Sequence, residues 1–143
     1  MKKTSELQIQ QVTWQQAEQP LSKIRTAVFI GEQQIVPEFE WDEIDTNAVH
    51  LLINVNDQPI ACLRIMDQHK IGRMAVLKAW RGKGVGMAIL LEAIKLCRQF
   101  GSQEVTLSAQ MHAIGFYKKA GFLQISDVYD DVGIPHVDMQ LTL

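Results

Sequence analysis

The chain has 143 residues, of which 47% are apolar and 21% are charged, a composition typical of one globular domain with a hydrophobic core. Its net charge of −2 and pI near 6.1 argue against a partner held mainly through nucleic-acid phosphates, so no nucleic acid is expected. No apolar run has the length of a signal peptide or of a membrane span. We therefore expect a single domain over residues 1–143 that is cytoplasmic and has no membrane partner.

The first part of the chain predicts a strand, a helix and an acidic loop. A strand is expected over Leu7–Val12, and apolar residues at helical spacing predict a helix from Ala17 to Phe29 that ends near Gly31. The loop that follows contains the acids Glu38, Glu40, Asp42, Glu43 and Asp45. We expect it to attract a cationic acceptor, with Trp41 as an aromatic contact, while a solvated surface loop is the alternative.

The middle and end of the chain predict further strands around two helices. Three strands are expected to form an antiparallel meander: Val49–Val55, Ile60–Ile65 and Ile71–Val76. After a glycine-rich turn, polar residues at three- and four-residue steps predict a long helix that ends at Gly101. The last expected elements are a strand, a short helix and two strands: Glu104–Ala109, Ala113–Lys119, Leu123–Tyr129 and His136–Leu143. This order indicates the α+β class, with a mixed central sheet.

The cysteines and histidines give no sign of a metal site. Cys62 and Cys97 each lie alone inside an apolar segment, so we interpret them as reduced core thiols. No cluster of histidine and cysteine has metal-ligand spacing. We therefore expect no metal.

The segment "WRGKGVGMAILL", residues 80–91, has three glycines at alternate positions and two cations directly before the long helix. Unpaired N–H groups and the positive end of the dipole at a helix start bind anions, and glycine lets the backbone approach a ligand closely. A dinucleotide fingerprint would need glycine at Met87, and a P-loop would need Ser or Thr at Gly84, so neither motif fits. We expect a phosphate to bind here, and a tight turn without a ligand is the alternative.

Three ordered motifs carry a resemblance to a known family. Residues Arg81–Gly86, "RGKGVG", resemble the pyrophosphate loop of the GNAT superfamily of acyl-CoA-dependent N-acyltransferases. Gly72–Val76 lies where that family has the central strand that contacts the pantetheine arm, and Ala113–Phe122 resembles its A-x-x-F-Y-x-x-x-G-F signature. Ile24–Gln33 and Gly133–Met139 are similar, more narrowly, to the YjcF/ElaA-like branch.

The resemblance covers the chain from about Val49 onward and implies a GNAT-like fold, a mixed and mostly antiparallel central sheet flanked by helices. It also implies acetyl-CoA as cosubstrate. The implied cofactor contacts are Met74, Ala75, Val76, Arg81, Gly82, Lys83, Gly84, Val85, Gly86, Met87, Gln110 and Tyr117. Gln110 departs from the family pattern, because many members have an Asn at this position that contacts the cofactor.

Acetyl transfer from a thioester to an amine needs an unprotonated nucleophile, a donor for the oxyanion and an acid for the departing thiolate. Tyr117 stands where the family commonly has its acid, and the reference pKa of a phenol, about 10, is close to that of a thiol. Backbone N–H groups near Met74–Val76 are expected to stabilise the oxyanion, provided that the strand is splayed there. Candidates for the general base, with a water chain as the alternative, are His136, Glu32, Glu43 and His50.

We therefore predict an N-acetyltransferase that transfers an acetyl group from acetyl-CoA directly to a primary amine, with a small cationic molecule as acceptor. The alternatives are an acetyltransferase of protein lysine or N-terminal amines, a non-catalytic acyl-CoA-binding or sensing domain, and a nucleotide-binding module that prefers ATP or NAD. Tyr117 favours an enzyme, because a binding domain has no need of its hydroxyl. A homodimer is left open.

Overall fold

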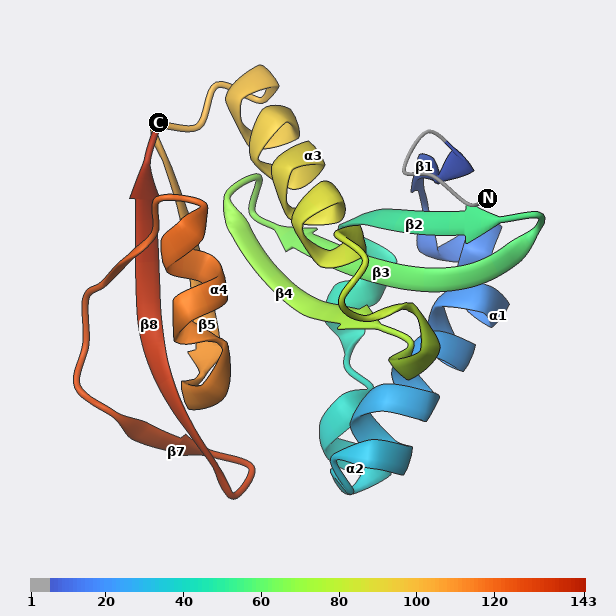
Figure 1. Cartoon of the computed structure of the whole chain (residues 1–143), viewed down its shortest axis with the longest axis horizontal. Coiled ribbons are helices and arrows are strands. Elements are labelled where there is room, and N and C mark those ends of the chain that lie inside the picture. Colours follow the sequence, from blue (N-terminus) through green and yellow to red (C-terminus); the bar gives the residue numbers. More distant parts are fainter. Residues whose placement is uncertain (1–5) are drawn as a thin grey trace.

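The structure is a computed structural model that describes residues 6–143. These residues contain an eight-stranded sheet in the order β1-β2-β3-β4-β5-β8-β6, with β7 paired to β8 (Figure 1). The strands are β1 (Gln8–Val12), β2 (Val49–Val55), β3 (Gln58–Met66), β4 (Lys70–Val76), β5 (Glu104–Gln110), β6 (Leu123–Gln124), β7 (Tyr129–Asp131) and β8 (Ile134–Thr142). Only the pair β4–β5 is parallel in this sheet, which confirms the predicted mixed, mostly antiparallel α+β fold.

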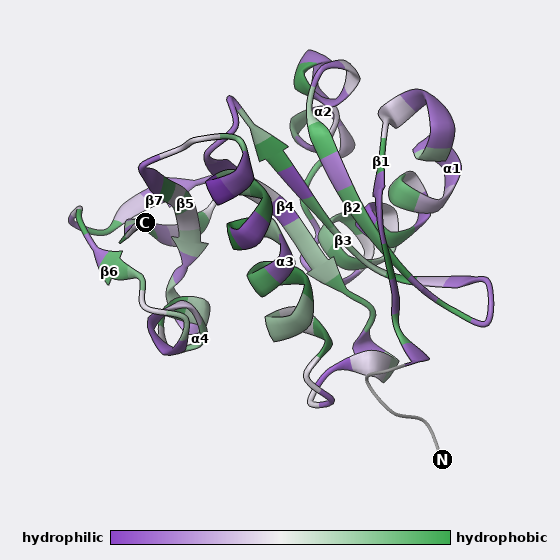
Figure 2. Ribbon diagram, turned by 90° about the horizontal axis from the view of Figure 1, so that it is seen from above, coloured by the Kyte–Doolittle hydropathy of each residue, from purple (hydrophilic) through white to green (hydrophobic). Residues whose placement is uncertain are grey.

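Helices cover both faces of the sheet. The α-helices are α1 (Trp14–Arg25), α2 (Pro37–Glu40), α3 (Val85–Gln99) and α4 (Ile114–Lys119). The wider π-helix η2 spans Thr26–Glu32, and the tighter 3-10 helices are η3 (Glu43–Thr46), η4 (Lys78–Trp80) and η5 (Met111–Ala113). Figure 2 shows α1 and α2 on one side of the sheet and α3 and α4 on the other. Because both faces of β2 and β3 are covered, most of their side chains are buried, including Leu51, Ile53, Leu63 and Ile65.

The predicted N-terminal helix is present, but it changes its winding halfway. A capping box between Thr13 and Gln16 starts α1, which buries an apolar stripe that includes Leu21 and Ile24. After Arg25 the chain continues as the π-helix η2. Wider π-helical turns are rare and frequent at functional sites, and this one ends beside the cleft described below.

The sheet opens between β4 and β5. These strands pair only at Lys70 with Thr106 and Ile71 with Leu107, and they diverge beyond that point. On the other edge of β4 the register with β3 shifts, so that Arg73 and Met74 together stand opposite a single residue, Leu63. Arg73 has a φ of 47°, which marks this as a β-bulge. The splay predicted near Met74 is therefore present.

One strand prediction is wrong over most of its length. Of the predicted strand Leu123–Tyr129, only β6 at its start and the first residue of β7 at its end pair with β8. Between them the N–H group of Asp138 donates to the Ser126 side-chain hydroxyl. A side chain thus takes an acceptor position in the ladder, and the backbone leaves the strand there.

The cysteines are buried free thiols, as predicted. Burial raises the pKa of Cys62 to about 12, which keeps this thiol protonated and inert. In the part of the chain that the structure describes, no three His, Cys, Asp or Glu side chains are grouped to hold a metal ion. None of the helices within residues 6–143 is both long enough and apolar enough to cross a membrane.

Candidate active site

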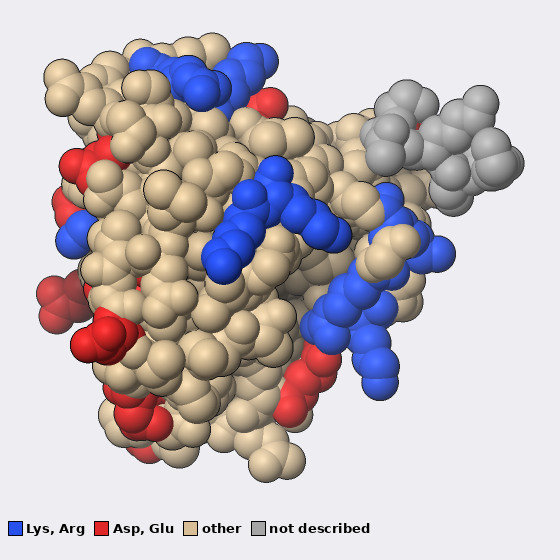
Figure 3. Space-filling model, turned by 60° about the vertical axis from the view of Figure 1, so that its left-hand side comes forward, with Lys and Arg blue, Asp and Glu red and all other residues tan. Residues whose placement is uncertain are grey.

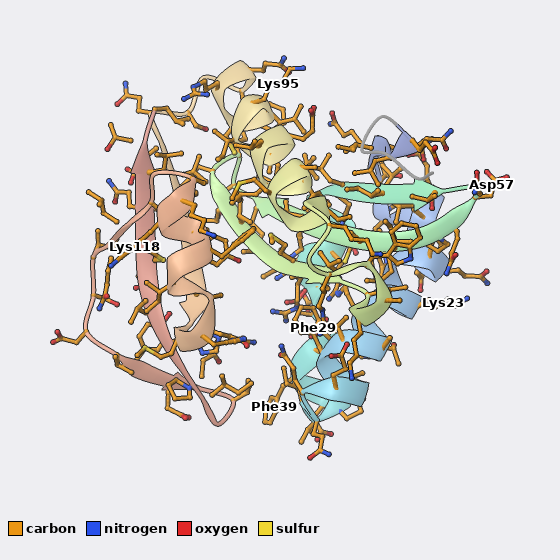
Figure 4. The ribbon with its side chains drawn as sticks, in the orientation of Figure 1. Lys23, Phe29, Phe39, Asp57, Lys95 and Lys118 are labelled. Carbon is orange, nitrogen blue, oxygen red and sulfur yellow. The ribbon has the colours of Figure 1, made fainter. Side chains whose placement is uncertain are left out.

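The divergence of β4 and β5 forms a cleft of about 1290 Å³. Its walls come from η2, α2, β4, the glycine turn before α3, β5, α4 and β8. Figure 3 shows lysine and arginine side chains gathered on both sides of a hollow in this face. Figure 4 shows Phe29 and Phe39 on the side of the gap formed by the N-terminal part of the chain, and both side chains line the cleft.

The glycine turn forms the start of α3 at the edge of the cleft. Gly82 and Gly84 have φ of 75° and 83°, and Gly84 is the N-cap of the helix. A Cβ atom at either position would meet nothing within 4 Å, so backbone conformation, and not crowding, requires glycine there. At Gly86 a Cβ atom would make an ordinary contact with the Phe116 ring, at 3.4 Å, so neither conformation nor crowding requires glycine there. The turn thus leaves the N–H groups of the helix start open to an anion.

Arg81 is the anchor of this turn. Its guanidinium donates to both carboxylate oxygens of Glu32, at 2.7 and 2.8 Å, and its Nε donates to the carbonyl oxygen of Val76 at 3.0 Å. These contacts connect η2, the end of β4 and the glycine turn. Both carboxylate oxygens of Glu32 already accept from Arg81, which argues against its predicted role as general base. Lys83 is exposed and does not line the cleft, unlike its neighbours from Arg81 to Met87.

Tyr117 lies on α4 and faces β4. Its hydroxyl is 4.0 Å from the sulfur of Met74, and its ring packs edge-on against the rings of Phe116 and Phe122. Burial raises the pKa of Tyr117 to about 12, so the phenol keeps its proton at neutral pH. The structure therefore brings the predicted acid and the predicted cofactor strand together in one cleft, where Met74, Ala75, Val76 and Tyr117 all contribute to the walls.

The edge of β4 that faces the cleft has backbone groups without a strand partner. Beyond Ile71 this edge no longer pairs with β5, while the opposite edge remains paired with β3 at Ala75 and Val76. N–H groups on the free edge are suited to bind a ligand carbonyl oxygen or a developing oxyanion.

His136 lies opposite Gln110 on β8 and lines the cleft. Its ring is 7% exposed, and Nδ1 lies 2.7 Å from the carbonyl oxygen of Ile134. A carbonyl oxygen only accepts, so Nδ1 carries the proton and donates it, and in the neutral ring Nε2 then has a free lone pair. The Tyr129 ring stacks on the imidazole at 6.2 Å between centroids. This tautomer suits His136 to accept a proton.

Two other candidates for the base lie outside the cleft. His50 is 1% exposed, and its Nε2 lies 2.9 Å from the carbonyl oxygen of Asp45. Burial lowers the pKa of His50, so the ring is neutral, but no ligand in the cleft can reach it. Glu43 is exposed on η3 and does not line the cleft either. Neither residue therefore lies where it could take a proton from an acceptor in the cleft.

Three carboxylates of the acidic segment, Glu40, Asp42 and Asp45, belong to an internal ion-pair network, which argues against the prediction that they attract a cationic acceptor. Arg25, which is 1% exposed, donates to Glu40 and to Asp45, each at 2.7 Å. Further ion pairs of 2.9 to 3.4 Å join Arg64 to Asp42 and Asp45, and Arg73 to Glu40 and Asp42. Trp41 also has an internal cation, because the Arg25 guanidinium lies 4.9 Å from its ring centroid. These groups hold α2 and η3 onto the sheet.

Gln110 forms a cross-cleft pair with Gln33, a residue that the sequence analysis did not assign to the site. Their side-chain amides exchange hydrogen bonds of 2.9 and 3.3 Å between β5 and the end of η2. Gln110 thus lines the cleft as predicted for a cofactor contact, but its amide already has a protein partner.

A second polar group was also missed. Ser108 and Asp138 line the cleft, and the Tyr129 hydroxyl bonds to both side chains. The sequence feature that could have identified this group is the polar and apolar alternation of β8. Its polar residues on one face are His136, Asp138 and Gln140, and Val137 and Met139 are buried on the other.

A splayed β4–β5 pair, a glycine turn at the start of the helix after β4, and a tyrosine facing the bulge are the features of the GNAT fold of acyltransferases. Comparison with known proteins agrees. The chain belongs to the GNAT acetyltransferase family, because residues 9–143 match the family described as "Acetyltransferase (GNAT) domain".

The relatives confirm the predicted branch. The chain is 34% identical over 120 residues to the uncharacterized N-acetyltransferase YjcF of Bacillus subtilis, a match that covers 81% of this chain and 86% of that protein. The crystal structure of Escherichia coli ElaA superimposes with a TM-score of 0.83 at 30% identity, covering 94% of this chain and 98% of that one. A putative N-acetyltransferase from Lactobacillus plantarum gives a TM-score of 0.88 at 28% identity, covering 96% and 98%.

Proposed function

We propose that the protein transfers an acetyl group from acetyl-CoA directly to a primary amine of a small cationic molecule. The observation that carries this proposal is the position of the Tyr117 hydroxyl, 4.0 Å from Met74 on the strand whose free edge faces the cleft. Support for the cosubstrate comes from a GNAT acetyltransferase of Elizabethkingia anophelis that has acetyl-CoA bound. It shares the fold of this chain, with a TM-score of 0.70 at 15% identity.

Two parts of the cleft fit acetyl-CoA. The N–H groups of the glycine turn, from Gly82 to Gly86, suit its pyrophosphate, and the free edge of β4 from Met74 to Val76 suits the amides of its pantetheine arm. When bound, acetyl-CoA supplies the thioester whose carbonyl carbon the amine attacks. Arg81 positions this surface, because it fixes the turn to β4 and to η2.

The side chains of the cleft suit the proton transfers of this reaction. Nε2 of His136 accepts a proton from the acceptor ammonium, which leaves the neutral amine that can attack. N–H groups on the free edge of β4 stabilise the oxyanion. Tyr117 then donates its proton to the departing thiolate sulfur. Burial raises the pKa of Tyr117 to about 12, and the same burial raises the proton affinity of a thiolate that leaves beside it.

The test is the release of free coenzyme A thiol from acetyl-CoA in the presence of a panel of primary amines. We expect release that depends on both the enzyme and the amine. Shifts of the unfolding temperature with acetyl-CoA, ATP and NAD run alongside, because a ligand that binds only the folded state raises its apparent stability. Binding of acetyl-CoA without turnover of any amine would indicate a sensing domain, and a shift with ATP or NAD alone would indicate a nucleotide-binding module.

A further inference from the structure

Among residues 6–143, Asp138 is a carboxylate in the cleft that has no basic partner. The acids that line the cleft are Glu32, Glu40, Asp131 and Asp138. Glu32 is paired with Arg81, and Glu40 is paired with Arg25. Within residues 6–143, no lysine or arginine lies within ion-pair distance of either Asp131 or Asp138. Their charge is thus available to a ligand.

Hydrogen bonds hold the Asp138 carboxylate in one orientation. The Tyr129 hydroxyl donates to Oδ1 at 2.6 Å. Because the phenol proton is used there, the Ser108 hydroxyl donates to the Tyr129 oxygen. The backbone N–H of Asp138 donates to the Ser126 hydroxyl at 2.8 Å. Oδ2, in contrast, has no hydrogen-bond partner in the part of the chain that the structure describes, so one oxygen of a fixed carboxylate is left for a donor from the ligand.

The same aromatic ring that holds Asp138 also stacks on His136. In the β5–β8 ladder Asp138 pairs with Ser108, and His136 pairs with Gln110. Asp138 and His136 occupy the same face of β8 two positions apart, which is about 7 Å along a strand. His136 is 7% exposed and lines the cleft, and its Nε2 has a free lone pair in the neutral ring. A proton acceptor and a fixed negative charge therefore lie side by side, at a spacing set by the strand.

We propose that Asp138 binds a second cationic group of the acceptor, so that the acceptor is a short aliphatic diamine or a longer molecule with the same pair of cations. This inference rests on the proposed function. The nitrogen near His136 loses its extra proton to Nε2 and forms the N–C bond while the C–S bond breaks. The thiolate takes its proton from Tyr117, and the second proton of the acylated nitrogen restores the Tyr117 phenol. The products are the N-acetylated amine and the coenzyme A thiol, and protonated His136 then releases its proton to solvent. The second ammonium or guanidinium stays protonated at Asp138 throughout, where a charge-assisted hydrogen bond holds it.

The test is a comparison of acceptors that differ in one terminal group, using acetyl-CoA and the full chain. Putrescine, butylamine and γ-aminobutyrate have the same carbon chain and end in a cation, a methyl group and an anion. We expect kcat/KM for putrescine to exceed that for butylamine by about tenfold, as for one charge-assisted hydrogen bond, and γ-aminobutyrate to be the poorest acceptor. In Asp138→Asn the ratio of putrescine to butylamine should fall to about two, the statistical factor left by the two equivalent amines of putrescine, because the carboxylate that selects the second charge is lost.

Two variants serve as controls. Asp127→Asn removes an exposed acid of the loop before β7 that does not line the cleft, and it should keep the wild-type ratio. Tyr129→Phe loses the bond to Oδ1 but keeps the carboxylate, so most of the ratio should remain. The two kcat/KM values of each ratio are measured on one enzyme preparation. A lower fraction of folded enzyme then reduces both values equally and cancels from the ratio.

The outcomes separate this inference from the proposed function. Acetylation of all three acceptors with equal kcat/KM by the wild type, or a ratio that Asp138→Asn leaves unchanged, would overturn the role of Asp138 and leave the acetyltransferase intact. No acetylation of any amine would overturn both. If Asp138→Asn does not fold, the wild-type ranking decides, because a site without a selecting carboxylate gives only the roughly twofold statistical preference for putrescine and its two equivalent amines.

Discussion

Arg81 and Glu32 form a bidentate ion pair, with N–O distances of 2.7 and 2.8 Å, between residues that are 49 positions apart. The pair fixes the start of the glycine turn to the end of η2, and the Arg81 Nε bond to Val76 fixes it to β4. Arg81 is 44% exposed and Glu32 34%, so the pair contributes little to global stability. We interpret its role as positioning the surface that binds coenzyme A.

Glu32→Gln should weaken coenzyme A binding several-fold, because it removes the charge that orients Arg81. At saturating acetyl-CoA, kcat should stay near that of the parent in Glu32→Gln and fall strongly in His136→Gln, since His136 and not Glu32 accepts the proton. Titration calorimetry and steady-state kinetics measure the two effects. A large loss of kcat in Glu32→Gln with little loss in His136→Gln would reverse the assignment.

Gly84 is the second test of the phosphate surface. Its φ of 83° costs a residue with a Cβ atom about 1–2 kcal/mol, but Asn tolerates this conformation better than most. Gly84→Asn should therefore retain part of the affinity for coenzyme A. Gly84→Asp has a side chain of the same size that carries a negative charge, so it should lose far more of this affinity. The gap between the two variants should narrow as salt rises. Equal affinity of the folded Asp and Asn variants at low salt would place the phosphates elsewhere.

Tyr117→Phe keeps the ring packing against Phe116 and Phe122 but removes the hydroxyl. We expect kcat to fall by about 10²-fold with the affinity for acetyl-CoA little changed, the usual size of a lost general acid. Because burial raises the pKa of Tyr117 to about 12, the loss should be constant across neutral and mildly alkaline pH. Single-turnover kinetics measure the chemical step, and a rate within twofold of the parent would make Tyr117 a packing residue.

We expect the buried ion-pair network to affect the stability of the protein and not its choice of acceptor. Asp45→Asn leaves Arg25 and Arg64 short of a counter-charge and should cost about 3 kcal/mol of unfolding free energy. The exposed neighbour substitution Glu43→Gln should cost less than about 0.5 kcal/mol. Urea unfolding measures both, and equal stability of the two variants would contradict the network.

Asp45, within this network, gives a pH dependence with a definite sign. Burial alone would raise the pKa of Asp45, but the hydrogen bonds and charges of Arg25 and Arg64 outweigh it and lower the pKa below its ordinary 3.8. A lowered pKa contributes stability that is present above 3.8 and is lost as pH falls through the folded value. The stability gap between the parent and Asp45→Asn should therefore shrink on acidification below that value. A gap that widens there would contradict the lowered pKa.

Local patterns predicted much of this fold. The alternation and apolar runs of β2, β3 and β4 predicted a meander, and Asn56 and Asp57, both at positive φ, form the tight hairpin turn that their residue types favour. The glycine turn was recognisable from the sequence because its anion site is made of consecutive backbone groups. The glycines that allow this backbone conformation are visible in the sequence itself.

Long-range pairings could not be predicted in this way. Arg25 stands on the apolar stripe of α1, yet nothing local identifies Glu40 and Asp45 as its partners, so the acids were interpreted as a free surface. Glu32 was a plausible base until its contact with Arg81 was known. In each case the contact joins elements whose mutual position depends on the whole sheet.

The most direct test of the central claim is the mass balance of one reaction with acetyl-CoA and an accepted primary amine. Direct transfer predicts one N-acetylated amine for each coenzyme A released, an enzyme of unchanged mass at every time point, and no release without amine. Mass spectrometry of the products and of the intact enzyme measures all three. An acetylated enzyme that forms without amine, or coenzyme A released with no acetylated amine, would contradict direct acetyl transfer in this cleft.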